Sequence, residues 1–172
     1  MLQQIRLWLH TDTPRERMPA PEPPADVAVD ALHARILRTL GRALAIRALD
    51  AGSCNACELE LAALMNPYYN VEGAGVRFVA SPRHADLLLV TGPVSRNMLV
   101  ALRRTYDAMP APKRVVAAGA CASGAGIFGE GYATVGRLDA VLPVDVEIPG
   151  CPPTPVALLQ GILAAVTPSV TG

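Results

Sequence analysis

The stretch ADLLLVT at residues 85 to 91 decides the fold class, because it is a short apolar run with almost no polar interruption. Three runs of similar character are VRFVA at residues 76 to 80, RVVAA at residues 114 to 118 and, more weakly, VDVEI at residues 144 to 148. Near-continuous apolar strands are typical of a parallel sheet that is buried on both faces. The four runs therefore predict strands of such a sheet.

Helical stretches separate these runs along the chain. The expected helices cover residues 58 to 65, 96 to 109 and 155 to 166. An alternation of buried strands and helices predicts an α/β fold, with a flavodoxin-like parallel sheet and helices on both faces. Residues 11 to 28 are instead rich in proline and charge, a composition that does not hold a helix. We therefore expect a disordered or extended arm over residues 1 to 28 and a single domain over residues 29 to 172.

A basic amphipathic helix is expected at the start of this domain, roughly from Val29 to Leu49. Its apolar residues repeat every four positions, at Leu32, Ile36, Leu40 and Leu44. Its opposite face carries Arg35, Arg38 and Arg42. Such a helix either lies at a membrane surface or in a partner groove, or it covers the domain's own sheet while its arginines are solvated.

The composition excludes some classes of function. A formal net charge of zero and an aromatic content of 4% argue against nucleic-acid binding. The charged fraction of 17% lies below the roughly 25% of a typical soluble domain, which indicates a surface that partner subunits cover. No apolar run approaches the roughly 20 residues of a membrane span, and the first ten residues do not resemble a signal peptide. We expect a cytoplasmic protein.

The four cysteines are the candidate functional residues: Cys54, Cys57, Cys121 and Cys151. Four thiolates are the usual ligand set of an iron–sulfur cluster or a structural zinc ion. A zinc ribbon would have a second Cys-x-x-Cys, and a thioredoxin-like site would not need the last two cysteines. The pattern favours an iron–sulfur cluster, and it leaves zinc and buried or redox-active thiols open as alternatives.

The predicted strands indicate how these cysteines meet. Cys121 follows the RVVAA run and Cys151 follows the VDVEI run, so both are expected beyond the carboxyl ends of parallel strands. Open α/β sheets bind ligands at that edge. Cys54 and Cys57 precede the helix expected over residues 58 to 65 and are expected to reach the same edge. Glu58 and Glu60 flank this loop, either as first-turn carboxylates at the helix dipole or as a proton relay beside the redox centre.

Five stretches of the chain resemble the 20 kDa subunit of respiratory complex I and the related small subunits of membrane-bound nickel–iron hydrogenases. They are GSCNACELE at 52–60, NPYYN at 66–70, ADLLLVTGPVSRNM at 85–98, GACASGAGIF at 119–128 and IPGCPPTP at 148–155. The first stretch is more similar to the hydrogenase branch, because complex I subunits have two adjacent cysteines where Asn55 and Ala56 separate Cys54 from Cys57 here. Cys-Asn-x-Cys-Glu is the pattern of the small subunits of formate hydrogenlyase and group 4 hydrogenases.

The resemblance implies a flavodoxin-like domain without flavin and one 4Fe-4S cluster on the four cysteines. It implies an electron-transfer subunit, without a complete active site of its own, in a hydrogenase or complex-I-like oxidoreductase. The alternatives are a quinone-reducing subunit of the complex I type and a non-redox, four-cysteine zinc module for assembly.

Partners and location follow from the same resemblance. The implied partners are a large subunit of the hydrogenase or 49 kDa type, a ferredoxin-like iron–sulfur subunit, and membrane subunits. The basic helix with Arg35, Arg38 and Arg42 is the expected contact with the membrane subunits. The implied location is peripheral, at the cytoplasmic face of the inner membrane.

Overall fold

The computed structural model describes residues 25–124, 126–129 and 131–167, so most of the expected arm lies outside the described residues. The strands of the main sheet are β1 (Leu44–Asp50), β2 (Val76–Phe78), β3 (Leu87–Thr91), β5 (Arg114–Ala118) and β7 (Val146–Ile148). The α-helices are α2 (Ala25–Leu40), α3 (Ala56–Ala63), α4 (Leu99–Ala108) and α5 (Pro155–Val166). The remaining elements are the 3₁₀ turns η1 (Pro82–His84) and η2 (Leu138–Ala140) and an antiparallel ribbon of β4 (Val94–Ser95) and β6 (Thr134–Gly136).

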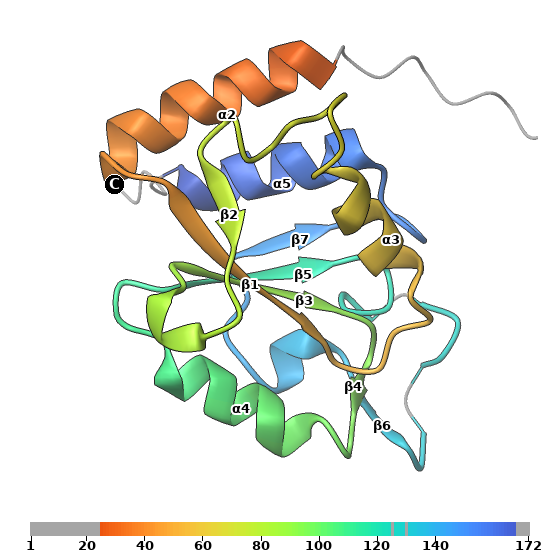
Figure 1. Cartoon of the computed structure of the whole chain (residues 1–172). Coiled ribbons are helices and arrows are strands. Elements are labelled where there is room, and N and C mark those ends of the chain that lie inside the picture. Colours follow the sequence, from red (N-terminus) through yellow and green to blue (C-terminus); the bar gives the residue numbers. More distant parts are fainter. Residues whose placement is uncertain (1–24, 125, 130, 168–172) are drawn as a thin grey trace, which may run out of the picture.

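The main sheet is parallel throughout, in the order β2-β1-β3-β5-β7. When only its own strands are counted, this is the 2-1-3-4-5 order of flavodoxin-like folds. Helices α2, α3 and α5 cover one face and α4 covers the other (Figure 1). The expected α/β fold class is confirmed.

Each face of the sheet has its own apolar core. Ile46 and Leu89 point toward α2 and α5, whose Ile36 and Ile162 are at most 1% exposed. On the other face, Leu88 and its neighbours pack against α4. Fully burying side chains of this size stabilises a fold by about 1.5–3 kcal/mol each. The apolar runs are therefore continuous because alternate residues fill two different cores.

One sequence prediction about the elements is wrong. The helix expected from Val29 to Leu49 begins at Ala25 and ends at Leu40, and residues 44–50 form β1, which pairs with both β2 and β3. The cause is Gly41, whose φ of 62° and N–H bond to the Leu37 carbonyl end the helix in a left-handed turn. Arg42 consequently lies beyond the helix and does not share a face with Arg35 and Arg38.

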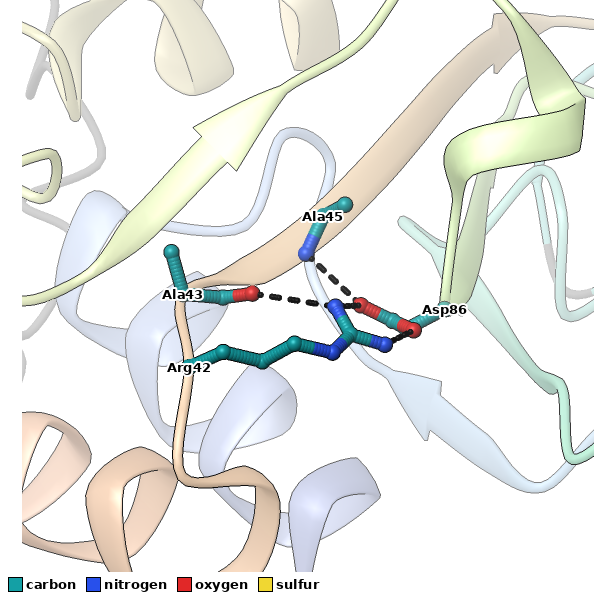
Figure 2. Close-up of polar contacts among 4 residues, drawn as sticks. All are labelled: Arg42, Ala43, Ala45 and Asp86. Atoms are coloured by element: carbon teal, nitrogen blue, oxygen red, sulfur yellow. Dashed lines mark hydrogen bonds and ion pairs between the residues drawn. The ribbon is translucent and has the colours of Figure 1, made fainter.

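The amino edge of the sheet is held by two aspartates. Asp86 accepts hydrogen bonds from both terminal nitrogens of Arg42, at 2.9 and 2.5 Å, and from the Ala45 N–H at 3.0 Å (Figure 2). Asp145 repeats the arrangement with Arg114 at 2.7 Å and the Val115 N–H at 2.8 Å. Each carboxylate lies just before one strand and accepts from an N–H at the start of the adjacent strand: Asp86 before β3 binds β1, and Asp145 before β7 binds β5.

Within the described residues, none of the helices has the length and apolar character needed to cross a membrane.

Candidate four-cysteine metal centre

The four cysteines lie in three loops at the carboxyl edge of the sheet. Cys54 and Cys57 follow β1, with Cys57 already in α3, whereas Cys121 follows β5 and Cys151 follows β7. The carboxyl ends of these parallel strands lie on one side of the molecule, the side where α3 begins (Figure 1). In a sheet of this strand order, this is the edge where ligands bind.

Hydrogen bonds shape the first cysteine loop as it leaves β1. The Asp50 carboxylate accepts from the Gly52 and Ser53 N–H groups at 2.7 and 2.6 Å, which turns the chain sharply. Asn55 then adopts a left-handed conformation, with a φ of 72°, directly before α3. This geometry leaves Cys54 exposed and Cys57 buried.

The loops of Cys121 and Cys151 run side by side. The Gly119 N–H donates to the Ile148 carbonyl at 2.8 Å, and the Ala120 N–H donates to the Gly150 carbonyl at 2.7 Å. These bonds extend the pairing of β5 with β7 past the last strand residues. The two cysteines are therefore carried by a continuation of the sheet itself.

Two glycines leave room for sulfur. A Cβ atom on Gly119 would lie 2.7 Å from the Sγ of Cys57, and one on Gly126 would lie 2.5 Å from the Sγ of Cys121. Gly119 also has a φ of 91°, a conformation that other residues rarely adopt. Both sulfur atoms thus lie directly against the backbone of a glycine. A side chain at either glycine position would overlap the space that the sulfur occupies.

The thiols lie close enough to affect one another's ionisation. Burial, and after it the charges of Glu58 and of the other three cysteines, together raise the pKa of Cys57 to about 11. The pKa of Cys121 is raised by burial, by Cys151 and by Cys54, while a hydrogen bond from the Ile127 backbone lowers it. Four mutually repelling thiolates at one place need a cation or cationic cluster to hold them, and amide hydrogen bonds to sulfur are typical of cluster ligands.

The donor set therefore fits an iron–sulfur cluster or zinc. All four cysteines are described and none forms a disulfide. Across residues 25–124, 126–129 and 131–167, no three His, Cys, Asp or Glu side chains already stand at the spacing of a metal centre. The structure brings the four predicted cysteines to one edge, and the fit rests on their chemistry and on the space beside Gly119 and Gly126.

The structure distinguishes the two glutamates. Glu58 is partly buried and accepts hydrogen bonds from the hydroxyls of Ser53, at 2.6 Å, and of Thr91. Because Thr91 is the last residue of β3, this carboxylate joins the first cysteine loop to the centre of the sheet. Glu60 lies two residues further along α3 and is also partly exposed. Sequence reasoning missed Thr91, although a threonine that ends a run of buried strand residues was a visible signal.

Large apolar side chains are exposed in the two segments of the chain that follow the first three cysteines. Leu59, Met65 and Tyr68 are on or just after α3, and Ile127, Phe128 and Tyr132 follow Cys121. Their exposed fractions range from 49% for Phe128 to 97% for Tyr132. Large apolar groups that are exposed together on one surface indicate a surface that binds another protein, and these residues are candidates for it.

The fold and the four thiols define a class: a flavodoxin-like domain with a four-cysteine site at the carboxyl edge of its sheet. A family model described as NADH ubiquinone oxidoreductase, 20 Kd subunit, matches residues 54–165. This match covers more than half of the chain, so the chain belongs to that family, the complex I 20 kDa subunit family. The resemblance that the five sequence stretches predicted is confirmed.

Individual relatives agree with this placement. The chain is 45% identical over 132 residues to the probable membrane-bound hydrogenase subunit mbhJ of Pyrococcus furiosus, a match that covers 77% of this chain and 79% of the relative. It is 40% identical over 153 residues to formate hydrogenlyase subunit 7 of Escherichia coli, covering 88% of this chain and 60% of the relative.

A solved structure matches the fold as well. A chain of the membrane-bound sulfane sulfur reductase, described as an archaeal respiratory membrane complex, superposes with a TM-score of 0.65 at 34% identity. The match covers 78% of this chain and 73% of that chain. The relatives are thus subunits of hydrogenases and related membrane complexes.

Proposed function

We propose that this chain is the electron-transfer subunit of a membrane-associated hydrogenase or complex-I-like oxidoreductase, and that Cys54, Cys57, Cys121 and Cys151 hold one 4Fe-4S cluster. The observation that carries the proposal is that three loops bring four thiols to one edge of the sheet, close enough that each of the other three raises the pKa of Cys57. Membership in the 20 kDa subunit family supports the same assignment.

The residues of the chain divide the work at this site. When bound, the cluster supplies reversible one-electron transfer. The four thiolates hold it, the Ile127 N–H bonds to the Cys121 sulfur, and Glu58 fixes the first loop through Ser53 and Thr91. Cys54 and Cys151 are exposed, which leaves one side of the site open toward a partner. Electrons would enter or leave on that side.

The catalytic partner is proposed to cover this opening and the exposed apolar side chains that follow the first three cysteines in the chain. A large subunit of the hydrogenase or 49 kDa type and a ferredoxin-like subunit are the proposed neighbours, since a single-cluster subunit needs both a donor and an acceptor. The separation of Cys54 from Cys57 by two residues favours a nickel–iron partner, as do the relatives named for hydrogenases. The likeness to a sulfane sulfur reductase chain supports, as a second candidate, a complex with a different terminal reaction.

The membrane subunits are proposed to lie near α2. Arg38 is exposed on this helix, and its Nε donates to the Ala34 carbonyl of the same helix at 3.1 Å, whereas the Nε of Arg35 is buried without a partner in the described structure. Arg42 is engaged with Asp86 and is a weaker candidate for this contact. A peripheral position at the cytoplasmic face of the inner membrane belongs to the same proposal.

The test is the metal content and redox spectrum of the full chain, purified without oxygen and reconstituted with iron and sulfide. We expect about four irons and four sulfides per chain, absorption near 400 nm and an electron paramagnetic resonance signal on reduction. A colourless protein with one zinc ion would overturn the proposal. Cys151→Ser should lose or convert the cluster, while Ser123→Ala, in the loop of Cys121, should keep it.

A proton-relay role for Glu58 or Glu60 stays a prediction. Glu58→Gln removes the ionisable group and keeps one oxygen, which accepts from either Ser53 or Thr91 but does not replace both carboxylate oxygens. If Glu58 transfers protons, the intact complex with this variant should turn over more slowly while the cluster signal is unchanged. Equal turnover by Glu58→Gln and the native complex would remove Glu58 from the relay.

A further inference from the structure

Arg137, between β6 and η2, packs against the loop of Cys121. A Cβ atom on Gly124 would lie 1.9 Å from the Cγ of Arg137 and 2.5 Å from its Cδ, so the aliphatic part of the arginine occupies the space that this glycine leaves open. The next N–H along the chain, that of Leu138, donates to the Ala122 carbonyl at 2.9 Å. Arg137 is therefore fixed on the segment that carries Cys121.

The guanidinium of Arg137 reaches the strand that leads to Cys151. Its Nε and Nη2 donate to the two carboxylate oxygens of Asp139 at 2.9 and 2.6 Å, and Nη2 lies 3.7 Å from a carboxylate oxygen of Glu147 in β7. One cation thus links the loop of Cys121 to β7. It also offsets part of the negative charge of two carboxylates at this side of the sheet.

Arg137 and Cys121 share a small hollow of about 70 Å³, which Pro93 and Phe128 also line. The Arg137 side chain is 49% exposed, so its charge is partly screened by solvent. The two other paired arginines that join neighbouring segments, Arg42 and Arg114, lie at the amino edge of the sheet. Of these three arginines, Arg137 is the one that lines a hollow together with a cysteine of the site.

We propose that Arg137 is a positioning residue for the redox centre: its charge raises the reduction potential of the cluster, and its contacts hold the Cys121 loop against β7. This inference rests on the proposed function, because it needs a cluster at the four cysteines. A positive charge near a cluster stabilises the reduced form, which carries one more negative charge. Without Arg137, Asp139 and Glu147 would act on the cluster unopposed.

The test is a redox titration of the reconstituted full chain, followed by electron paramagnetic resonance, with Arg137→Met. Methionine keeps an aliphatic side chain over Gly124 and removes the charge. We expect the iron content to be retained and the equilibrium constant for one-electron reduction to fall roughly threefold to tenfold, where tenfold equals about 59 mV. The shift should shrink at high salt, and Arg137→Lys should restore most of it. Arg114→Met, which breaks a similar pair at the amino edge, should leave the potential unchanged.

A second variant tests the same inference with the opposite sign. Asp139→Asn removes the negative charge that offsets the guanidinium and should raise the potential. If Arg137→Met does not fold, Arg137→Gln, which removes the charge and keeps an amide group for Asp139, is titrated in its place and should lower the potential. An unchanged potential in a cluster-loaded Arg137→Met, or an unchanged or lower potential in Asp139→Asn, would overturn the inference and leave the proposed function intact. Native chain that binds no iron and sulfide would overturn the proposed function itself.

Discussion

The amino ends and the carboxyl ends of the parallel strands, here called the amino edge and the carboxyl edge, differ in how their charged and polar groups are paired. At the amino edge, Asp86 and Asp145 each satisfy an arginine and a backbone N–H, and they lie in ordinary turns before strands. At the carboxyl edge, thiols lie side by side with raised pKa values, and the backbone relies on glycines with positive φ. Groups that repel each other are retained in a fold where a ligand compensates them. The amino edge therefore stabilises the domain, and the carboxyl edge is arranged for binding.

The amino edge also contains a cavity that is larger than the hollow beside Cys121. This cavity is consistent with a stabilising role for the amino edge. A pocket of about 340 Å³ lies between the ends of α2 and α5 and the starts of the strands. The two arginines that line it, Arg42 and Arg114, are each already paired with an aspartate. Their charges are thus compensated within the chain, in contrast to the thiols at the other edge.

Among the variants that test this difference between the two edges, we expect the largest effect, a loss of bound iron, at Gly119. Gly119→Ala places a Cβ 2.7 Å from the Cys57 sulfur and strains a backbone with a φ of 91°. We expect the reconstituted variant to lose most of its iron. Gly41→Ala is the matched control, because Gly41 also has positive φ but nothing lies within 4 Å of its Cβ position. It should keep its iron and lose about 1–2 kcal/mol of stability. Full iron content in Gly119→Ala would refute the close placement of the sulfur.

Asp86→Ala should have the opposite effect: it should lower the stability of the chain and leave the metal centre unchanged. It removes the partner of Arg42 and leaves the Ala45 N–H without its acceptor, so we expect the free energy of unfolding to fall by about 2–3 kcal/mol. The measurement is urea unfolding of the metal-free chain, and the potential of the loaded chain should not change. As a control, Asp139→Ala breaks a more exposed pair and should cost less than about 1 kcal/mol. A potential shift in Asp86→Ala would show that the two edges are not independent.

A smaller effect is expected at Thr91, which is 1% exposed at the carboxyl edge. Thr91→Val keeps the shape but removes the hydroxyl that donates to Glu58, so the free energy of unfolding should fall by about 1–2 kcal/mol. Thr39→Val, at an exposed position of α2, is the control and should be nearly neutral. If Thr91→Val is as stable as the native chain, Glu58 does not join the first cysteine loop to β3.

The sequence predicted the parts of the fold that local pattern decides. Four of the sheet's strands were found from apolar runs, and α5 was placed at its observed bounds from Pro155 to Val166. β1 was missed because Leu44 continues the four-residue spacing of Leu32 and Ile36, and only Gly41 marks the break. The ribbon of β4 and β6 is two and three residues long, too short for any periodicity.

The site was predictable to the level of its cysteines. A cysteine after each of two strands had to reach the carboxyl edge, since parallel strands end together. The packing of Arg137 on Gly124 and the contact of Thr91 with Glu58 join residues 13 and 33 positions apart. Such contacts depend on how the loops fold over one another, and no spacing in the sequence encodes them.

The smallest expected effect concerns pH, and it tests whether the thiols are held together before any metal binds. Because the pKa of Cys57 is raised to about 11 from an ordinary value of 9.0, the folded chain binds more protons than the unfolded chain between these values. The stability linked to this thiol is therefore fully present below pH 9 and is lost as the pH rises toward 11. Urea unfolding of the metal-free, reduced chain should show this decline.

Cys57→Ser isolates the contribution of that thiol, because serine does not ionise in this range and other titrating groups are common to both proteins. The native chain should lose more stability between pH 9 and 11 than the variant does. Parallel curves would mean that Cys57 is solvated in the metal-free chain and that the carboxyl edge is assembled only when a cluster binds. A difference between the curves would mean that the fold already buries Cys57 beside Glu58 and the other thiols before a cluster binds, so that ionising this thiol costs stability.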